Sequence, residues 1–124
     1  MNELLIKPNK DTLEIKCAKG KISMSGNSIL PNPQTFFKPV NEWVDEYIKS
    51  PAEKTAISLK FNYVDTASVQ AVFDILKKFR DIPNFEEKVY VDWYFEFDDP
   101  ELLEVGEIME GRLKLKFNFI EYSA

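Results

Sequence analysis

Apolar and polar residues alternate along five stretches of the chain. These stretches are residues 12–17, 19–26, 55–64, 86–97 and 112–122. Successive side chains of a β-strand point to opposite faces of its sheet, so each alternation predicts a strand with one apolar face. The strongest case is residues 86–97, where Val89, Val91 and Trp93 alternate with polar or aromatic residues. A short link joins the first two stretches, and it predicts a β-hairpin.

Three further segments have apolar residues at helical spacing instead. They are residues 33–50, 66–79 and 98–111. In the first, we expect the regular helix to begin near Pro39, because proline fits the first turn of a helix and not its interior. In the third, we expect Asp98 or Asp99 as the N-cap and Gly111 as the stop.

The order of these elements predicts the fold class. Strands that alternate with helices favour parallel pairing with right-handed crossovers. Parallel strands covered on both faces are apolar throughout, whereas each of these strands keeps one polar row. We therefore predict a two-layer α/β fold: a mixed, mostly parallel sheet of about five strands with helices on one face. A length of 124 residues suits a single domain over residues 1–124.

Composition then removes several classes of function. The chain has no histidine and a single cysteine, Cys17, so disulfides, the usual zinc sites and Ser-His triads lose their central residues. A formal net charge of −5 makes nucleic acid a poor partner. The four glycines are scattered, which removes the glycine-rich phosphate loops, and we expect neither cofactor nor metal. Without a long apolar run at the N-terminus, we expect no signal peptide and no membrane partner, and we predict a cytoplasmic protein.

Acidic residues are the candidates for enzyme chemistry. One group at the start of the third predicted helix consists of Asp98, Asp99, Glu101 and Glu104. This group could hold a divalent cation, but negative charge also simply stabilises a helix N-terminus. Asp92, on the polar row of a strand, could act as a general base, although a solvated strand residue is the simpler interpretation.

Two tyrosines are candidates for a binding surface. Tyr90 and Tyr94 lie on the polar row of the same predicted strand. Exposed aromatics on a sheet form a plausible contact patch, but they can equally pair across strands. A contact patch of this kind would make the chain a constitutive protein-interaction or ligand-binding module without covalent control.

Hydroxyl and carboxyl side chains gather where the third strand meets the second helix. Asp65, Thr66 and Ser68 stand at this junction, and Asp65 or Thr66 as an N-cap explains their types. The junction also lies at the carboxyl end of a strand, where open α/β sheets place their sites. A phosphate on Thr66 would be stabilised there by free helix amides and by the helix dipole.

Motifs around this junction resemble a known family. They are Ser25-Gly26-Asn27-Ser28, Phe37-x-x-Val40-x-x-Trp43 and Tyr63-x-x-Thr66-x-Ser68, within "KGKISMSGNSILPNPQTFFKPVNEWVDEYI" and "LKFNYVDTASVQAVFDIL". With the order of elements, they resemble the STAS domain of anti-sigma-factor antagonists. More closely, the chain resembles the SiaC-like regulatory phosphoproteins, a small bacterial family with a STAS-like fold.

The resemblance implies a switch that is not an enzyme. In the family, a dedicated kinase phosphorylates a threonine in an Asn-Thr-Ser-Ser motif, and a PP2C-type phosphatase reverses the modification. The unmodified form binds and activates a diguanylate cyclase, which raises cyclic di-GMP and favours biofilm formation. Thr66 occupies the threonine position and is the expected phosphoacceptor, with Ser68 as the second choice.

Two positions depart from the family pattern. Asp65 stands where the family often has asparagine, and its charge would either oppose an adjacent phosphate or assist a magnesium-bound kinase site. Ala67 replaces a serine, and in STAS antagonists generally the modified hydroxyl can fall at this next residue. The expected surroundings of the phosphosite are Asn62, Asp65, Ala67 and Ser68. The candidate partner surface consists of Asn27, Ser28, Tyr90 and Tyr94.

Overall fold

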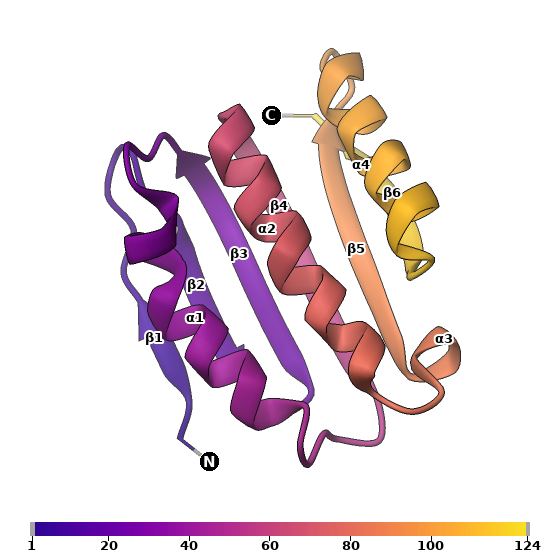
Figure 1. Ribbon diagram of the computed structural model, residues 1–124. Helices are drawn as coiled ribbons and strands as arrows, with labels where there is room; N and C mark the ends of the chain where they lie inside the picture. The colour runs from indigo at the N-terminus through magenta and orange to yellow at the C-terminus, as the bar shows by residue number, and fades with distance from the viewer. Residues whose placement is uncertain (1, 124) are drawn as a thin grey trace.

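Six strands form one sheet in the order in which they occur along the chain (Figure 1). The computed structural model describes residues 2–123. The strands are β1 (Leu4–Ile6), β2 (Glu14–Ala18), β3 (Lys21–Ser28), β4 (Thr55–Val64), β5 (Val89–Glu96) and β6 (Lys116–Tyr122). β1, β2 and β3 pair antiparallel, and β3 to β6 pair parallel. The predicted mixed, mostly parallel α/β class is confirmed, with six strands rather than five.

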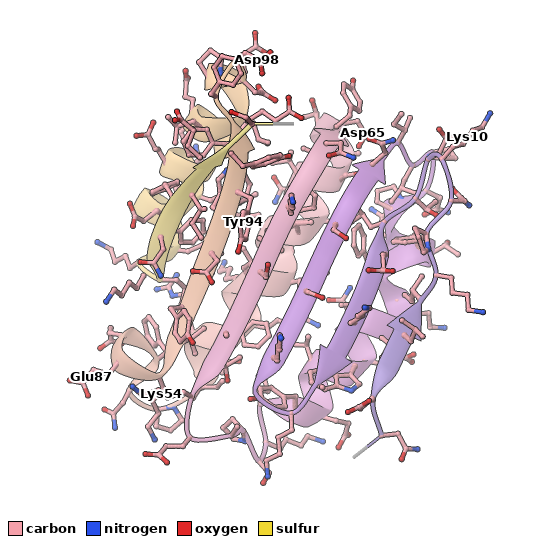
Figure 2. The ribbon with its side chains drawn as sticks, turned by 180° about the vertical axis from the view of Figure 1, so that it is seen from behind. Lys10, Lys54, Asp65, Glu87, Tyr94 and Asp98 are labelled. Atoms are coloured by element: carbon pink, nitrogen blue, oxygen red, sulfur yellow. The ribbon has the colours of Figure 1, made fainter. Side chains whose placement is uncertain are left out.

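The helices lie on one face of this sheet (Figure 1). They are α1 (Pro33–Tyr47), α2 (Thr66–Lys78), the 3-10 turn η1 (Phe79–Asp81), the short α3 (Phe85–Lys88) and α4 (Pro100–Leu113). Seen from behind, the sheet presents its polar row with no helix over it (Figure 2). The structure therefore has two layers and one sheet face without helices, as the alternation along the strands predicted.

The core lies between the sheet and the helices. Along β5 the inward Val89, Val91 and Trp93 are buried, and the residues between them are only partly so. From the helix layer, Phe37 of α1 and Leu76 of α2 are completely buried against this face. The apolar face of the strands, with its period of two, and the apolar faces of α1 and α2, with their helical period, thus pack together in one core.

Two helix boundaries differ from the prediction. α1 begins at Pro33 instead of near Pro39, because Asn32 accepts a hydrogen bond from the Thr35 amide at 3.3 Å and caps the helix there. Pro39 therefore lies inside the helix. α4 continues past Gly111 to Leu113, and the left-handed residue that follows its end is Lys114, with φ of 60°.

Trp93 fixes α4 against the sheet. Its indole Nε1 donates to the carbonyl of Leu102 at 3.1 Å. A Cβ added at Gly106 would lie 2.6 Å from the same Nε1, so only glycine lets the helix approach the indole this closely. Helix α4 comes directly after β5 in the chain (Figure 1). Its first turn lies next to the β4–α2 junction, because Asp99 and Leu102 line one shallow pocket together with Val64.

Candidate functional site

The junction between β4 and α2 is built by Asp65. β4 ends at Val64 and α2 begins at Thr66, and Asp65 between them is the N-cap. Its Oδ1 accepts a hydrogen bond from the amide of Ser68 at 2.8 Å. This bond satisfies one of the amides that a helix N-terminus leaves without a partner. In Figure 2, Asp65 lies at the carboxyl end of the parallel strands, as the sequence predicted for this junction.

The carboxylate of Asp65 also binds the neighbouring connection. Its Oδ2 accepts from the amide of Leu30 at 3.1 Å, and its own amide donates to the carbonyl of Ser28 at 3.0 Å. Partial burial by itself would raise the pKa of Asp65, but the hydrogen bonds from Ser68 and Leu30 outweigh it and lower the pKa below its ordinary value. The ionised carboxylate therefore joins the start of α2 to the segment that leads into α1.

Ser68 and Ser28 are buried together beneath this junction. The hydroxyl of Ser28 donates to the Oγ of Ser68 at 2.8 Å, and the Ser68 hydroxyl lies 3.3 Å from the carbonyl of Ser28. Neither serine has exposed surface. The expectation that Ser28 belongs to a partner surface is therefore wrong, because its side chain turns inward to pair with Ser68.

Thr66 has the opposite environment. It stands at the first position of α2 with an exposed side chain, and Ala67 beside it is exposed as well. Asn62, near the end of β4, is also exposed. The sequence held a signal for this difference between the two hydroxyls. Ser68 lies four residues before the buried Val72, on the inward face of the helix, whereas Thr66 is a little over half a turn away from it.

The bare sheet face carries an aromatic cluster that sequence reasoning found only in part. The rings of Tyr94 and Tyr122 meet edge to face with centroids 6.5 Å apart. The ammonium of Lys60 lies 4.6 Å from the centroid of Tyr122 and 5.8 Å from that of Tyr94. Figure 2 shows Tyr94 on this face. Lys60 and Tyr122 were missed because only the pairing of β4 and β6 with β5 brings them beside Tyr94.

The remaining residues of the predicted surface are partly buried. Tyr90 is half-buried on the bare face. The side-chain amide of Asn27 donates to the carbonyl of Lys10 at 3.0 Å, so it holds a loop. Asp92, the candidate general base, is not part of that surface. It accepts from the Asn118 side chain at 3.1 Å in a cross-strand pair.

Of the acidic residues at the start of α4, Asp99 is the one that caps the helix. Asp99 accepts from the amide of Leu102 at 3.1 Å as the N-cap. Within residues 2–123, no three acidic or cysteine side chains converge as a metal site requires. Burial raises the pKa of Cys17 to about 12, which keeps its thiol protonated and unreactive at neutral pH. None of the helices in the described part of the chain has the length and apolar character needed to span a bilayer.

Comparisons with known proteins show relatives of this chain. A family described as SiaC family regulatory phosphoprotein matches residues 6–122. An uncharacterised protein of Pseudomonas aeruginosa strain UCBPP-PA14 is 25% identical over 88 residues, which are 71% of this chain and 70% of that protein.

Two crystal structures from Pseudomonas aeruginosa have the same fold. Apo-SiaC matches with a TM-score of 0.85 and 24% identity, over 97% of this chain and 99% of its own. A chain in the structure of the diguanylate cyclase SiaD with its activator SiaC matches with a TM-score of 0.86 and 22% identity. That match covers 96% of this chain and 99% of that one.

Proposed function

The chain belongs to the SiaC family of regulatory phosphoproteins, and we propose that it is a protein-binding switch controlled by phosphorylation of Thr66. The switch has no catalytic residues of its own. The unmodified form binds and activates an output protein, and the phosphorylated form releases it.

The observation that carries this proposal is the contrast between two hydroxyls in one helical turn. Thr66 is exposed at the first position of α2, and Ser68 is fully buried against Ser28. A kinase must bring the acceptor oxygen into its own active site, which favours the exposed threonine. The positive end of the helix dipole stabilises the added charge of about −1.5 to −2 at this position.

We propose a diguanylate cyclase as the output partner. SiaC of Pseudomonas aeruginosa is the activator of the diguanylate cyclase SiaD. This chain has the fold of SiaC over nearly the full length of both proteins. By the same relationship, a dedicated kinase and a PP2C-type phosphatase set the modification. The output is then the level of cyclic di-GMP and biofilm formation.

Phosphorylation can oppose binding through desolvation. A partner that covers the carboxyl end of the sheet would cover Thr66 as well. A doubly charged phosphate there loses its water when the partner docks, and burial of an unpaired charge is costly. The nearby Asp65 carboxylate adds to the negative charge that the partner has to cover.

The first experiment locates the phosphate. Intact mass and peptide mapping of residues 61–77, on protein purified from its native host, should show a fraction with one phosphate on Thr66. Phosphate on Ser68 would move the site, and a chain that is unmodified under all growth conditions would contradict the proposal.

The second experiment tests the switch with matched variants. Purified diguanylate cyclase from the same host should be activated by Thr66→Ala, and Thr66→Glu should activate it at least about tenfold less. Thr35→Glu is the control, because Thr35 is exposed in the first turn of α1. Equal activation by Thr66→Ala and Thr66→Glu would exclude Thr66 as the switch.

The aromatic cluster supports a second candidate, a constitutive binding module. Tyr94 and Tyr122 bracket the ammonium of Lys60 on the bare face, and such aromatic surfaces recur in protein interfaces. For this function, Tyr94→Ala abolishes binding of the partner and Thr66→Glu leaves it unchanged. Partner binding by Tyr94→Ala and by Thr66→Glu therefore distinguishes the two functions.

A further inference from the structure

We propose that Asp65 is a positioning residue that couples phosphorylation of Thr66 to the conformation of residues 30–32. The inference rests on the proposed function only in taking Thr66 as the modified residue. These residues belong to the connection 29–32 between β3 and α1, which is held at both of its ends. The amide of Ile29 donates to the carbonyl of Asp11 at 2.9 Å, and Asn32 caps α1.

A single carboxylate holds both sides of this junction. One oxygen of Asp65 accepts from Ser68 in α2, and the other accepts from Leu30 in the connection. The two oxygens belong to one rigid planar group. A rotation that withdraws the carboxylate from Ser68 therefore also withdraws it from Leu30.

A phosphate on Thr66 acts directly on this carboxylate. The two groups stand on adjacent residues, and both are negative at neutral pH, so they repel each other. They also compete for the same free amides at the start of α2, because anions bind at helix N-termini. The phosphate carries the larger charge, and the Asp65 carboxylate is the group that yields.

Loss of the carboxylate leaves the Leu30 amide without its acceptor. The side chain of Leu30 is 9% exposed and packs into the core, whereas Ile29 beside it is 46% exposed. Loosening of residues 30–32 therefore changes the surface next to Thr66 at the carboxyl end of the sheet. In this way a modification of one exposed side chain alters an area large enough for a partner to sense.

The variant Asp65→Asn separates the two hydrogen bonds. Asparagine is a good N-cap, and its carbonyl oxygen can still accept from Ser68. Its amide group is a donor and cannot accept from the Leu30 N–H. The variant should therefore keep α2 capped and the chain folded while it releases the connection without any phosphate.

The test is residue-resolved amide hydrogen exchange by NMR. Wild type and Asp65→Asn are compared, each unmodified and with phosphothreonine incorporated at position 66 during synthesis, so that no kinase or partner is needed. In wild type, phosphothreonine should speed exchange of the Leu30 amide about tenfold or more, as expected for loss of a bond to a charged acceptor. The Ile29 amide, held by Asp11, should not change.

In Asp65→Asn, the Leu30 amide should exchange fast already and phosphothreonine should add nothing, while the Ser68 amide stays protected. Unchanged Leu30 exchange in phosphorylated wild type would overturn the proposal, and so would an equal phosphate effect in the variant. If the variant fails to fold, the wild-type pair alone still decides. Failure of the cyclase experiment with a clear exchange effect would contradict the proposed function and leave this coupling intact.

Discussion

The hydroxyl of Ser28 donates a hydrogen bond to the Oγ of Ser68 at 2.8 Å, and both side chains are completely buried. The pair joins β3 to the first turn of α2, across 40 residues of sequence. Buried hydroxyls need partners, because an unpaired one costs free energy. The pair therefore has a structural role, in contrast to Thr66, which stands exposed two residues before Ser68.

The first prediction concerns Ser68→Ala. This change leaves the Ser28 hydroxyl buried without its acceptor and should lower the free energy of unfolding by about 1–2 kcal/mol in urea denaturation. With Thr66 as the phosphoacceptor, as proposed, the variant should still be phosphorylated in the native host. The double variant Ser28→Ala with Ser68→Ala should cost less than the two single variants added together, since it removes both polar groups. Disappearance of the phosphate in Ser68→Ala would make Ser68 the acceptor instead.

The sequence predicted the layers of this fold because the patterns that define them are local. Alternation along β5 marks which side chains are buried, and the helical period of α2 does the same. β1 was not predicted, since "LLI" has three apolar residues and no alternation. The start of α1 was wrongly predicted to lie near Pro39. The cap at Asn32 outweighs the backbone hydrogen bond that a proline inside the helix removes, so the helix begins at Pro33.

The site was predictable only where its signals are local in the sequence. Asp65 as a cap follows from residue type and position, and the structure shows it as the N-cap of α2. The bond from Leu30 to Asp65 had no local signal, since it uses a backbone amide 35 residues away. The burial of Ser28 is likewise set by its partner in α2 and not by its own neighbours in sequence.

The second prediction is a pH dependence that Asp65 contributes. Its pKa is lowered in the folded chain, with burial opposing the shift and the bonds from Ser68 and Leu30 dominating it. A lowered folded pKa means stability that is fully present above the unfolded value of about 3.9 and is lost as pH falls through the folded value. Urea midpoints at pH 7 and pH 3 should therefore differ less in Asp65→Asn than in wild type. An equal acid sensitivity of the two would show that this carboxylate is not preferentially ionised in the folded state.

The third prediction compares two glycines of α4. Gly106→Ala places a methyl group 2.6 Å from the Trp93 indole nitrogen and should lower the free energy of unfolding by about 1–3 kcal/mol. Gly111→Ala, in the same helix, meets no atom within 4 Å and should raise it by about 0.5–1 kcal/mol. Thermal unfolding followed by tryptophan fluorescence measures both. A gain of stability in both variants would mean that α4 does not pack this closely on β5.

The fourth prediction concerns Tyr47, which links three chain segments near the amino-terminal ends of the parallel strands β3 and β4. Its hydroxyl accepts from the amides of Gly20 at 3.1 Å and Ala52 at 3.2 Å, and it lies 2.7 Å from the hydroxyl of Thr55. The two amides occupy both lone pairs of the Tyr47 oxygen, so its proton goes to Thr55.

Tyr47→Phe removes one oxygen and leaves three polar groups without their partner. It should therefore lower the free energy of unfolding by about 2–3 kcal/mol in urea denaturation, more than the loss of a single hydrogen bond. Tyr90→Phe is the matched control, since Tyr90 is half-buried on the bare face, and it should change stability by less than about 0.5 kcal/mol. Partner binding should survive Tyr47→Phe under conditions where the variant is folded, because Tyr47 lies at the end of the sheet opposite Thr66. If Tyr47→Phe proved no more damaging than Tyr90→Phe, water would have to replace the lost hydroxyl as the partner of both amides.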